Sequence, residues 1–272
     1  MKKLLTLTAI IGILVLGFYS YFHNVGRVRA NVNEIFITSA DIPAPFEGAR
    51  VVQISDLFVR NEHCLELLEN VVNTVNGIKP DIIIFTGNLF RSEGIMFEGQ
   101  VADLLGDLNA NIIRVAVLGY HDLPHYELIS NVLSTAEFRL LYNESFEVFY
   151  QSPIGINVIG AAPTNDRATM ERLLEKHAHD NRFNLLLMSV PTFSTVAFAH
   201  PVHAQFSGHC LATQDATNPL SPCFQFYNGT YQFADYFTLH VSSGLARFHS
   251  IPGMFRQPSI DSFLLRSPPI RN

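Results

Sequence analysis

The chain has 272 residues, of which 48% are hydrophobic and 15% charged, and this composition excludes a disordered chain because it supplies the apolar material of a large core. The formal net charge is −6, from 18 Lys and Arg against 24 Asp and Glu, so we expect no nucleic-acid partner. The three cysteines have unrelated spacings and form no C-x-x-C pair, so we expect neither a disulfide framework nor a structural zinc site. Cys64 and Cys223 are expected to be buried as small hydrophobic residues.

The N-terminus begins with an uncharged apolar stretch at 4–22, about 19 residues long, which is enough for a helix to cross a bilayer. A cleaved signal peptide has a shorter apolar region followed closely by small residues, whereas this stretch ends in Tyr19, Tyr21 and Phe22. We therefore interpret it as an uncleaved transmembrane anchor, with a cleaved signal as the alternative.

The charges that flank this stretch oppose one another. Lys2 and Lys3 favour a cytoplasmic N-terminus, while Arg27 and Arg29 follow the stretch closely and favour the reverse. We expect a single-pass membrane protein whose globular domain lies outside the cytoplasm. The predicted divisions are a signal anchor at 1–22, a juxtamembrane linker at 23–32 and one globular domain at 33–272.

Strand and helix patterns alternate after the linker. Strands are predicted at 34–38, 50–55, 81–87, 112–118, 145–150, 155–160 and 185–189, and helices at 62–76, 97–109, 124–136 and 165–178. The order strand, helix, strand indicates parallel βαβ units. Beyond residue 208 strand-like runs predominate, and we expect antiparallel additions to a second sheet, with Asn228-Gly229 as a hairpin turn.

Five apolar runs end in small or polar residues, which is the pattern of buried strands that deliver their next side chains to a shared rim. These segments are VVQISDLF (51–58), DIIIFTGNLFR (81–91), VAVLGYHD (115–122), LLLMSVP (185–191) and FSGHC (206–210).

In order and spacing, the five segments resemble the calcineurin-like metallophosphoesterases, and in particular their membrane-attached bacterial branch of UDP-2,3-diacylglucosamine pyrophosphatase-like enzymes. The corresponding family loops read D-x-H, G-D, G-N-H-D/E, H-P and G-H-x-H, and the resemblance covers about residues 33–266. It implies an α/β fold of the four-layer αββα type, in which two mixed sheets are flanked by helices.

The resemblance also implies a site of two metal ions that activate a water and clamp the oxygens of a phosphoryl transfer. Asp56 matches the first metal ligand, and His209 matches the penultimate one. His121 stands at the position of the general acid. Asn88 stands where the family has a bridging Asp, and a neutral amide cannot supply that negative charge.

Other positions depart further from the family pattern. Phe58 and Val190 replace ligand histidines and cannot coordinate a cation, and Tyr120 replaces a ligand Asn. Arg91 stands where many relatives carry an acidic residue that orients the catalytic His. The remnant ligands Asp56, Asn88 and His209 are too few for a two-metal site.

We therefore expect a membrane-anchored, non-catalytic protein without a cofactor, which binds an unknown protein or a lipid-associated ligand. The alternative is an active phosphoesterase or pyrophosphatase with a remodelled, single-metal site. That enzyme would hold one divalent ion such as Mn or Zn with Asp56, Asn88 and His209, with Cys210 as a further ligand if the loop shifts, while His121 protonates the leaving group. Four other histidines could be recruited, namely His63, His125, His200 and His203.

Overall fold

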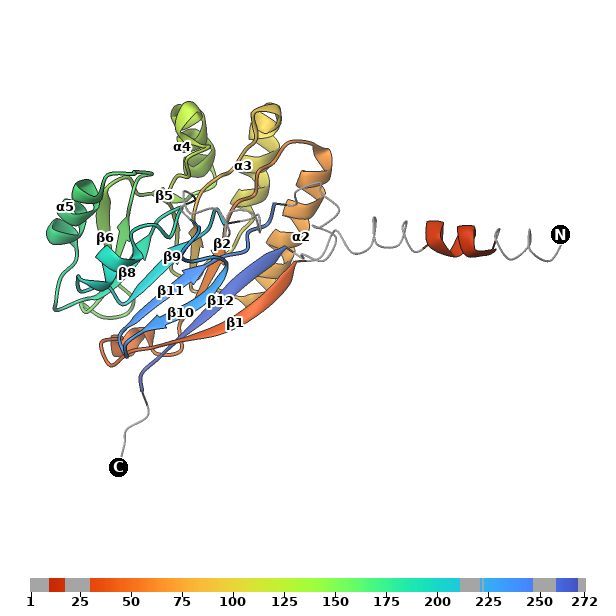
Figure 1. Ribbon diagram of the computed structural model, residues 1–272. Helices are drawn as coiled ribbons and strands as arrows, with labels where there is room; N and C mark the ends of the chain where they lie inside the picture. The colour runs from red at the N-terminus through yellow and green to blue at the C-terminus, as the bar shows by residue number, and fades with distance from the viewer. Residues whose placement is uncertain (1–9, 18–29, 211–220, 222, 247–257, 269–272) are drawn as a thin grey trace.

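The computed structural model describes residues 10–17, 30–210, 221, 223–246 and 258–268. The strands are β1 (Asn31–Thr38), β2 (Arg50–Ile54), β3 (Ile82–Phe85), β4 (Ile113–Ala116), β5 (Arg139–Leu140), β6 (Glu144–Val148), β7 (Ile156–Gly160), β8 (Phe183–Leu187), β9 (Ala204–Ser207), β10 (Gly229–Phe233), β11 (Phe237–Val241) and β12 (Ser259–Arg266). They form two six-stranded sheets, with the orders β1-β12-β2-β3-β4-β5 and β10-β11-β9-β8-β7-β6 (Figure 1).

Helices cover the outer face of each sheet. α2 (Glu62–Ile78), α3 (Glu98–Gly106) and α4 (Tyr126–Thr135) pack on the first sheet, and α5 (Arg167–His177) and α6 (Ser194–Phe198) pack on the second. Within the described residues there are also three short 3-10 helices: η1 (Ala44–Phe46), η2 (Ser92–Phe97) and η3 (Leu123–His125). The predicted four-layer αββα arrangement of two mixed sheets is confirmed.

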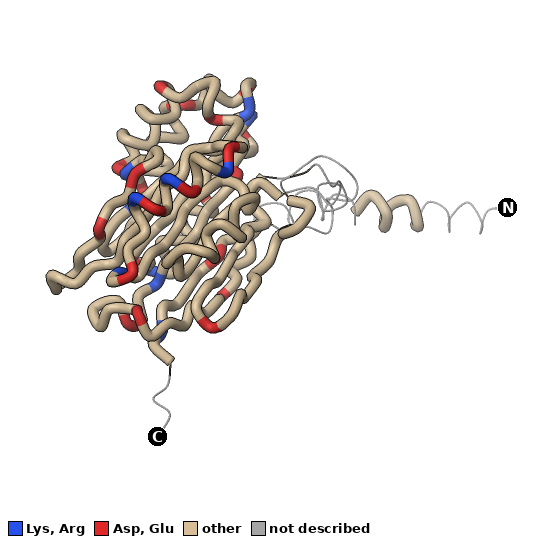
Figure 2. The backbone as a smooth tube through the Cα atoms, turned by 60° about the vertical axis from the view of Figure 1, so that its left-hand side comes forward, with Lys and Arg blue, Asp and Glu red and all other residues tan. Residues whose placement is uncertain are grey.

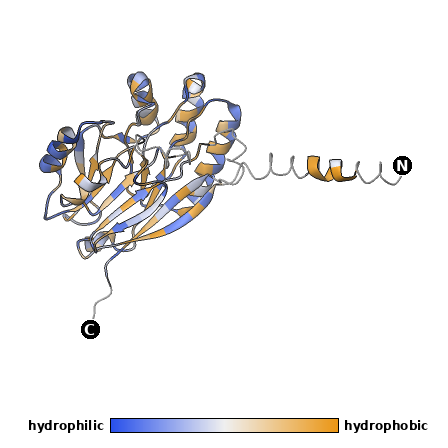
Figure 3. Cartoon of the chain, viewed as in Figure 1, coloured by the Kyte–Doolittle hydropathy of each residue, from blue (hydrophilic) through white to orange (hydrophobic). Residues whose placement is uncertain are grey.

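Alternation of side chains along buried strands explains the layers. In β3, Ile83 faces the helices of the first sheet, whereas Ile82 and Ile84 face the second sheet. In β8, Leu185 faces inward and Leu186 faces α5 and α6. Both faces of these strands are buried, which is why the sequence reads as continuous apolar runs (Figure 3).

Local sequence signals determine where α2 begins and ends. The side chain of Asn61 accepts a hydrogen bond from the backbone N–H of Cys64 and caps the first turn. The helix buries Leu68 and other apolar residues at helical spacing. It ends at Ile78, because the next residue, Lys79, adopts a left-handed conformation (φ 55°) directly before Pro80.

Cys223 is buried as expected, but the expectation that the cysteines form no disulfide is wrong. Cys210 and Cys223 form a disulfide with a Cα–Cα distance of 5.5 Å, and only Cys64 is free, half-buried at the start of α2. The two bonded cysteines are 13 positions apart in the sequence, and this spacing alone could not reveal that they pair.

Two predictions for the C-terminal part are also corrected. The turn between β10 and β11 lies at 234–236, because Phe233 pairs with Phe237, and Gly229 is instead the first residue of β10. Strand β11 joins β9 in parallel, and β12 inserts between β1 and β2 in the first sheet. The C-terminal strands are therefore shared between the two sheets and are not all antiparallel.

Most of the predicted membrane-spanning segment lies outside the described residues. Its described part, 10–17, is helical, exposed, apolar and free of charge (Figures 2 and 3). Among the helices that the structure describes, none has the length and apolar character needed to cross a bilayer.

We predict that Leu68→Ala lowers the free energy of unfolding by about 2–5 kcal/mol, because it leaves a cavity in the layer between α2 and the first sheet. Leu65→Ala is the matched control, since Leu65 is only half-buried and should cost less. Denaturant unfolding of both variants measures the difference. Equal losses would contradict the packing described for α2.

Candidate active site

The loops that follow five strands meet at one edge of the sandwich. Strands β2, β3 and β4 run parallel in the first sheet and β8 and β9 run parallel in the second, so their carboxyl ends lie together. Backbone hydrogen bonds join neighbouring loops, from Asp56 N–H to Gly87 O (3.0 Å) and from Gly208 N–H to Ser189 O (3.0 Å). The five predicted segments thus form one site.

Asp56 lies at the centre of this site and is fully buried. Its Oδ1 accepts a hydrogen bond from Asn88 Nδ2 (2.7 Å), and its Oδ2 accepts from Ser55 Oγ (2.7 Å) and from the backbone N–H of His209 (2.8 Å). Because Asp56 belongs to the first sheet and His209 to the second, this carboxylate connects the two sheets. Burial raises the pKa of Asp56 to about 6, although these hydrogen bonds oppose the increase.

The amide of Asn88 has its orientation set by its neighbours. Nδ2 donates to Asp56, and Oδ1 accepts the backbone N–H of His121 (3.2 Å). The flipped amide would place an oxygen against a carboxylate and an NH2 group against an N–H. The carbonyl oxygen, which is the only metal-binding atom of this side chain, therefore points away from Asp56.

Asp122 is a structural residue that the sequence interpretation left without a role. Its Oδ2 accepts the backbone N–H groups of Asn88 (2.7 Å) and Gly119 (2.7 Å), and its Oδ1 accepts that of Leu89 (2.8 Å). The side chain is fully buried, and burial raises its pKa to about 6. In the sequence, the position of Asp122 directly after His121 was the feature that could have identified it as a residue of the site.

Four residues of the site adopt left-handed backbone conformations: Asp56 (φ 55°), Phe58 (φ 44°), Asn88 (φ 65°) and His209 (φ 68°). Residues other than glycine seldom adopt this conformation, which costs of order 1–3 kcal/mol each. The strained turns persist because hydrogen bonds such as those to Asp56 hold them. They bend each loop sharply at the end of its strand.

The rim of the site is a row of aromatic and basic groups. The guanidinium carbon of Arg91 lies 4.1 Å from the centre of the Phe58 ring, and the ring of His121 meets Phe58 edge-on with centroids 5.0 Å apart. The rings of His121 and His209 are 6.0 Å apart. Burial, followed by the positive charges of Arg91 and His209, lowers the pKa of His121.

Apolar packing occupies the opposite side of the site. Val190 is buried in the cluster between the second sheet and its helices, and Tyr120 packs against the same cluster. The hydroxyl of Tyr120 donates to Asn165 Oδ1 (2.6 Å), and burial raises its pKa. Val190 therefore offers only hydrocarbon at its position. The hydroxyl of Tyr120 is engaged with Asn165.

The donor groups at the site do not fit a metal centre. Asp56, Asn88 and His209 do come together, but Asn88 Nδ2 lies 3.4 Å from His209 Nδ1 and presents nitrogen to both partners. In the described ranges, no group of three or more His, Cys, Asp or Glu side chains could hold a metal ion. Cys210 cannot serve as the further ligand, because its sulfur is bonded to Cys223.

Three of the other histidines lie elsewhere. His63 contacts Glu66 on α2 (3.0 Å), His200 Nδ1 lies 2.9 Å from Val196 O, and His203 contacts Asp41 (3.1 Å). None of these contacts includes a residue of the site.

Two stacked mixed sheets with helices outside, and a site built from five strand ends, define the metallophosphoesterase architecture. A sequence model described as "Calcineurin-like phosphoesterase" matches residues 49–210, which include all five segments. The chain belongs to the calcineurin-like phosphoesterase family, and the resemblance found in the sequence is confirmed.

Individual relatives agree with this assignment. An uncharacterized metallophosphoesterase of Bacillus subtilis, YkuE, is 27% identical over 92% of this chain and 91% of its own length. The UDP-2,3-diacylglucosamine pyrophosphatase LpxG of Chlamydia muridarum is 31% identical over 30% of this chain, which spans 25% of that protein. Among solved structures, the NAD nucleotidase NadN of Haemophilus influenzae shares the fold, with a TM-score of 0.51 at 14% identity over 73% of this chain and 45% of that protein.

Gly119 is predicted to be indispensable to the geometry around Asn88. A Cβ atom at this position would lie 2.1 Å from Asn88 Oδ1, so Gly119→Ala should lower the free energy of unfolding by about 1–3 kcal/mol. A Cβ at Gly99, in the first turn of α3, would meet nothing within 4 Å, and Gly99→Ala should change the free energy of unfolding by less than about 0.5 kcal/mol. Thermal or denaturant unfolding compares the pair, and a neutral Gly119→Ala would contradict the close contact.

The buried carboxyls should titrate abnormally. We expect carbon NMR titration of labelled Asp side chains to give midpoints of about 6 for Asp56 and Asp122, because burial disfavours their charged forms. Exposed Asp166 is the internal control, and the hydrogen bond from Thr169 should hold its pKa below the usual 3.8. The two buried groups then stabilise the fold fully below about pH 4, and this contribution is lost as the pH rises through about 6. Midpoints near 4 would show that hydrogen bonding outweighs burial.

Proposed function

We propose that this protein is a non-catalytic member of its family, anchored to a membrane, that uses the rim of the former metal site to bind a protein or a lipid-associated ligand. The observation that carries the proposal is the 2.7 Å hydrogen bond from Asn88 Nδ2 to Asp56 Oδ1. It places an N–H donor where the reaction needs a carboxylate shared between two cations. Asp56 is thereby used to hold the loops together.

The losses affect both sides of the site. Phe58 contacts His121 and Arg91, and Val190 is buried in the second sheet's outer cluster. Neither side chain carries an atom that can bind a metal, so no change of rotamer would provide a ligand at either position. A remodelled site could tolerate the loss of one ligand. The simultaneous replacement of several is better explained by selection for a task other than hydrolysis.

The disulfide supports a location outside the cytoplasm. Disulfides persist in oxidising compartments and are rare in the cytosol, so the Cys210–Cys223 bond agrees with the placement expected from the N-terminal sequence. The membrane anchor remains a proposal, based on the apolar stretch at 4–22.

Strand register favours a rim that faces the membrane. Asn33 of β1 pairs with Asp261 of β12, which pairs with Gln53 of β2, three residues before Asp56. The N-terminal end of β1 therefore lies at the same edge as the site. The residues between position 22 and β1 can span at most about 25–30 Å, which would keep the rim close to an anchor at 4–22.

The chemistry of the rim suits an amphiphilic ligand. Arg91, His121 and His209 provide cationic or hydrogen-bonding groups, and half-buried Tyr120 provides apolar surface beside them, while Phe58 is buried against Arg91 and His121. A relative with local similarity is named as a pyrophosphatase of UDP-2,3-diacylglucosamine, which motivates the choice of a lipid-associated ligand.

Metal content and hydrolysis test the proposal together. The full chain, purified in detergent and supplied with Mn²⁺, should retain less than one equivalent of metal by elemental analysis and should not hydrolyse phosphodiester or pyrophosphate substrates. The matched variant carries four substitutions that restore family ligands: Phe58→His, Asn88→Asp, Tyr120→Asn and Val190→His. It should retain more Mn²⁺ than the unaltered chain, because carboxylate and imidazole donors are returned.

Stoichiometric metal in the unaltered chain, together with hydrolysis that His121→Ala abolishes, would overturn the non-catalytic assignment. It would establish the single-metal enzyme in its place.

A further inference from the structure

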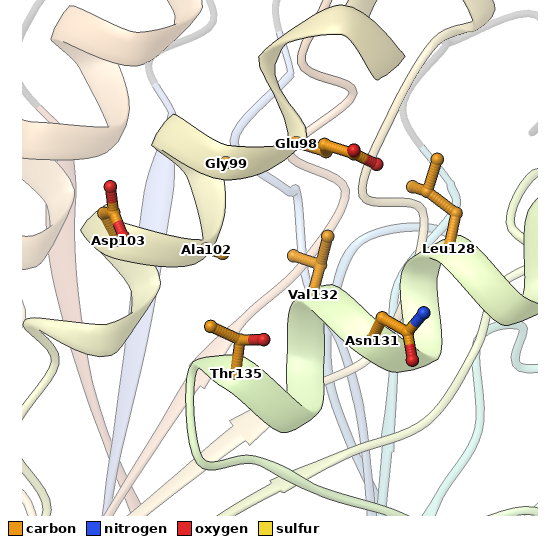
Figure 4. Close-up of a pocket in the computed structure, with 8 residues that line it drawn as sticks. All are labelled: Glu98, Gly99, Ala102, Asp103, Leu128, Asn131, Val132 and Thr135. Atoms are coloured by element: carbon orange, nitrogen blue, oxygen red, sulfur yellow. The ribbon is translucent and has the colours of Figure 1, made fainter.

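A groove runs between α3 and α4, on the helical layer that covers the first sheet (Figure 4). Its volume is about 490 Å³, which is within the range of binding pockets. Ala102 and Val132 are buried at its floor, and Leu128 is half-buried on its wall. Exposed Glu98 and Asp103 stand on its α3 side.

The Asp, Glu, Lys and Arg residues within the helices around this groove are all acidic, and Arg114, which donates to the carbonyl of Gly106 at the end of α3, is already paired with Glu137. Helices α2, α3 and α4 carry three, two and one acidic residues respectively and no Lys or Arg. Acidic residues in a first turn stabilise a helix through its dipole, which accounts for Glu98. Asp103 lies in the second turn of α3, where this explanation fails. Neither Glu98 nor Asp103 forms an ion pair with any residue that the structure describes.

Gly99 keeps the groove open. It is the second residue of α3, and a Cβ there would meet nothing within 4 Å, so no close contact requires glycine. The space beside Gly99 is therefore open, which is consistent with a site that a partner fills.

We propose that this groove binds a basic amphipathic helix of another protein. An apolar floor between two helices accepts side chains spaced at i, i+4 and i+7 of a guest helix, and acidic margins attract flanking Lys or Arg. The nine residues of α3 extend about 13 Å, which matches two to three turns of such a guest. This proposal is independent of the metal content of the site.

A second copy of the chain is a poorer occupant. The basic helical residues of the described chain lie on α5, where Arg167 pairs with Glu171 (2.8 Å) and Lys176 follows Glu175. If α5 of a second copy occupied the groove, its acidic residues would lie close to Glu98 and Asp103 and repel them. The groove therefore fits a guest helix whose basic residues lack such acidic neighbours.

Peptide binding to the full chain tests the proposal. The probe is a labelled 14-residue amphipathic peptide of about four turns, with Leu at i, i+4 and i+7 and Lys on both margins, and fluorescence anisotropy reports binding. A matched peptide has Glu in place of Lys. We expect the Lys peptide to bind at least about tenfold more tightly than the Glu peptide, and its binding to weaken as salt is added.

Variants of the chain locate the bound peptide. Gly99→Trp fills the groove and Asp103→Lys reverses its charge, and each should weaken binding of the Lys peptide about tenfold. The matched control is Glu69→Lys, an exposed charge reversal on α2 away from the groove, which should change binding less than about threefold. Circular dichroism and the unfolding midpoint confirm that each variant is folded.

Three results would overturn the proposal. The first is that neither peptide binds. The second is equal binding of the Lys peptide to the unaltered chain and to both folded groove variants, which would indicate general charge attraction. The third is a dimer in sedimentation experiments that Gly99→Trp converts to a monomer, which would identify a second copy as the occupant.

Discussion

The buried carboxylate of Asp56 is the interaction on which the site depends. It accepts hydrogen bonds from Ser55 Oγ, from the Asn88 side chain and from the His209 backbone, and so joins the loops of two sheets. An ionised carboxylate buried without partners would be very costly, and three donors offset much of that cost. Amide and hydroxyl hydrogens thus compensate part of the negative charge of Asp56.

The close packing of the loops explains why the glycines of the family motifs are present in this chain. Gly87 has a positive φ of 94°, and a Cβ there would lie 2.3 Å from the backbone nitrogen of Gly119. A Cβ at Gly208 would lie 2.0 Å from Ser55 Oγ. These positions are constrained by the close approach of loops, whether or not a metal binds. Ligand positions such as Phe58 and Val190 carry no such constraint, which explains how they could change while the glycines stayed.

The sequence allowed the fold and the meeting of the five loops to be predicted, because the apolar runs of β3 and β8 are continuous and are followed closely by loops with polar residues. It could not reveal which way the Asn88 amide points, since that depends on Asp56 and on the His121 backbone. The disulfide and the position of β12 were missed for a related reason. Both depend on contacts between segments that are distant in the chain.

Strand β12 has a consequence for how the chain acquires its structure. It separates β1 from β2, and the bond from Asn33 to Asp261 joins residues 228 positions apart. Among the strands that the structure describes, β1 pairs with β12 alone, so it leaves the ribosome well before its partner strand has emerged. During synthesis Val32 and Phe36 of β1 would therefore be carried without a sheet partner, and β1 can take its place in the first sheet only when β12 is available to pair with it.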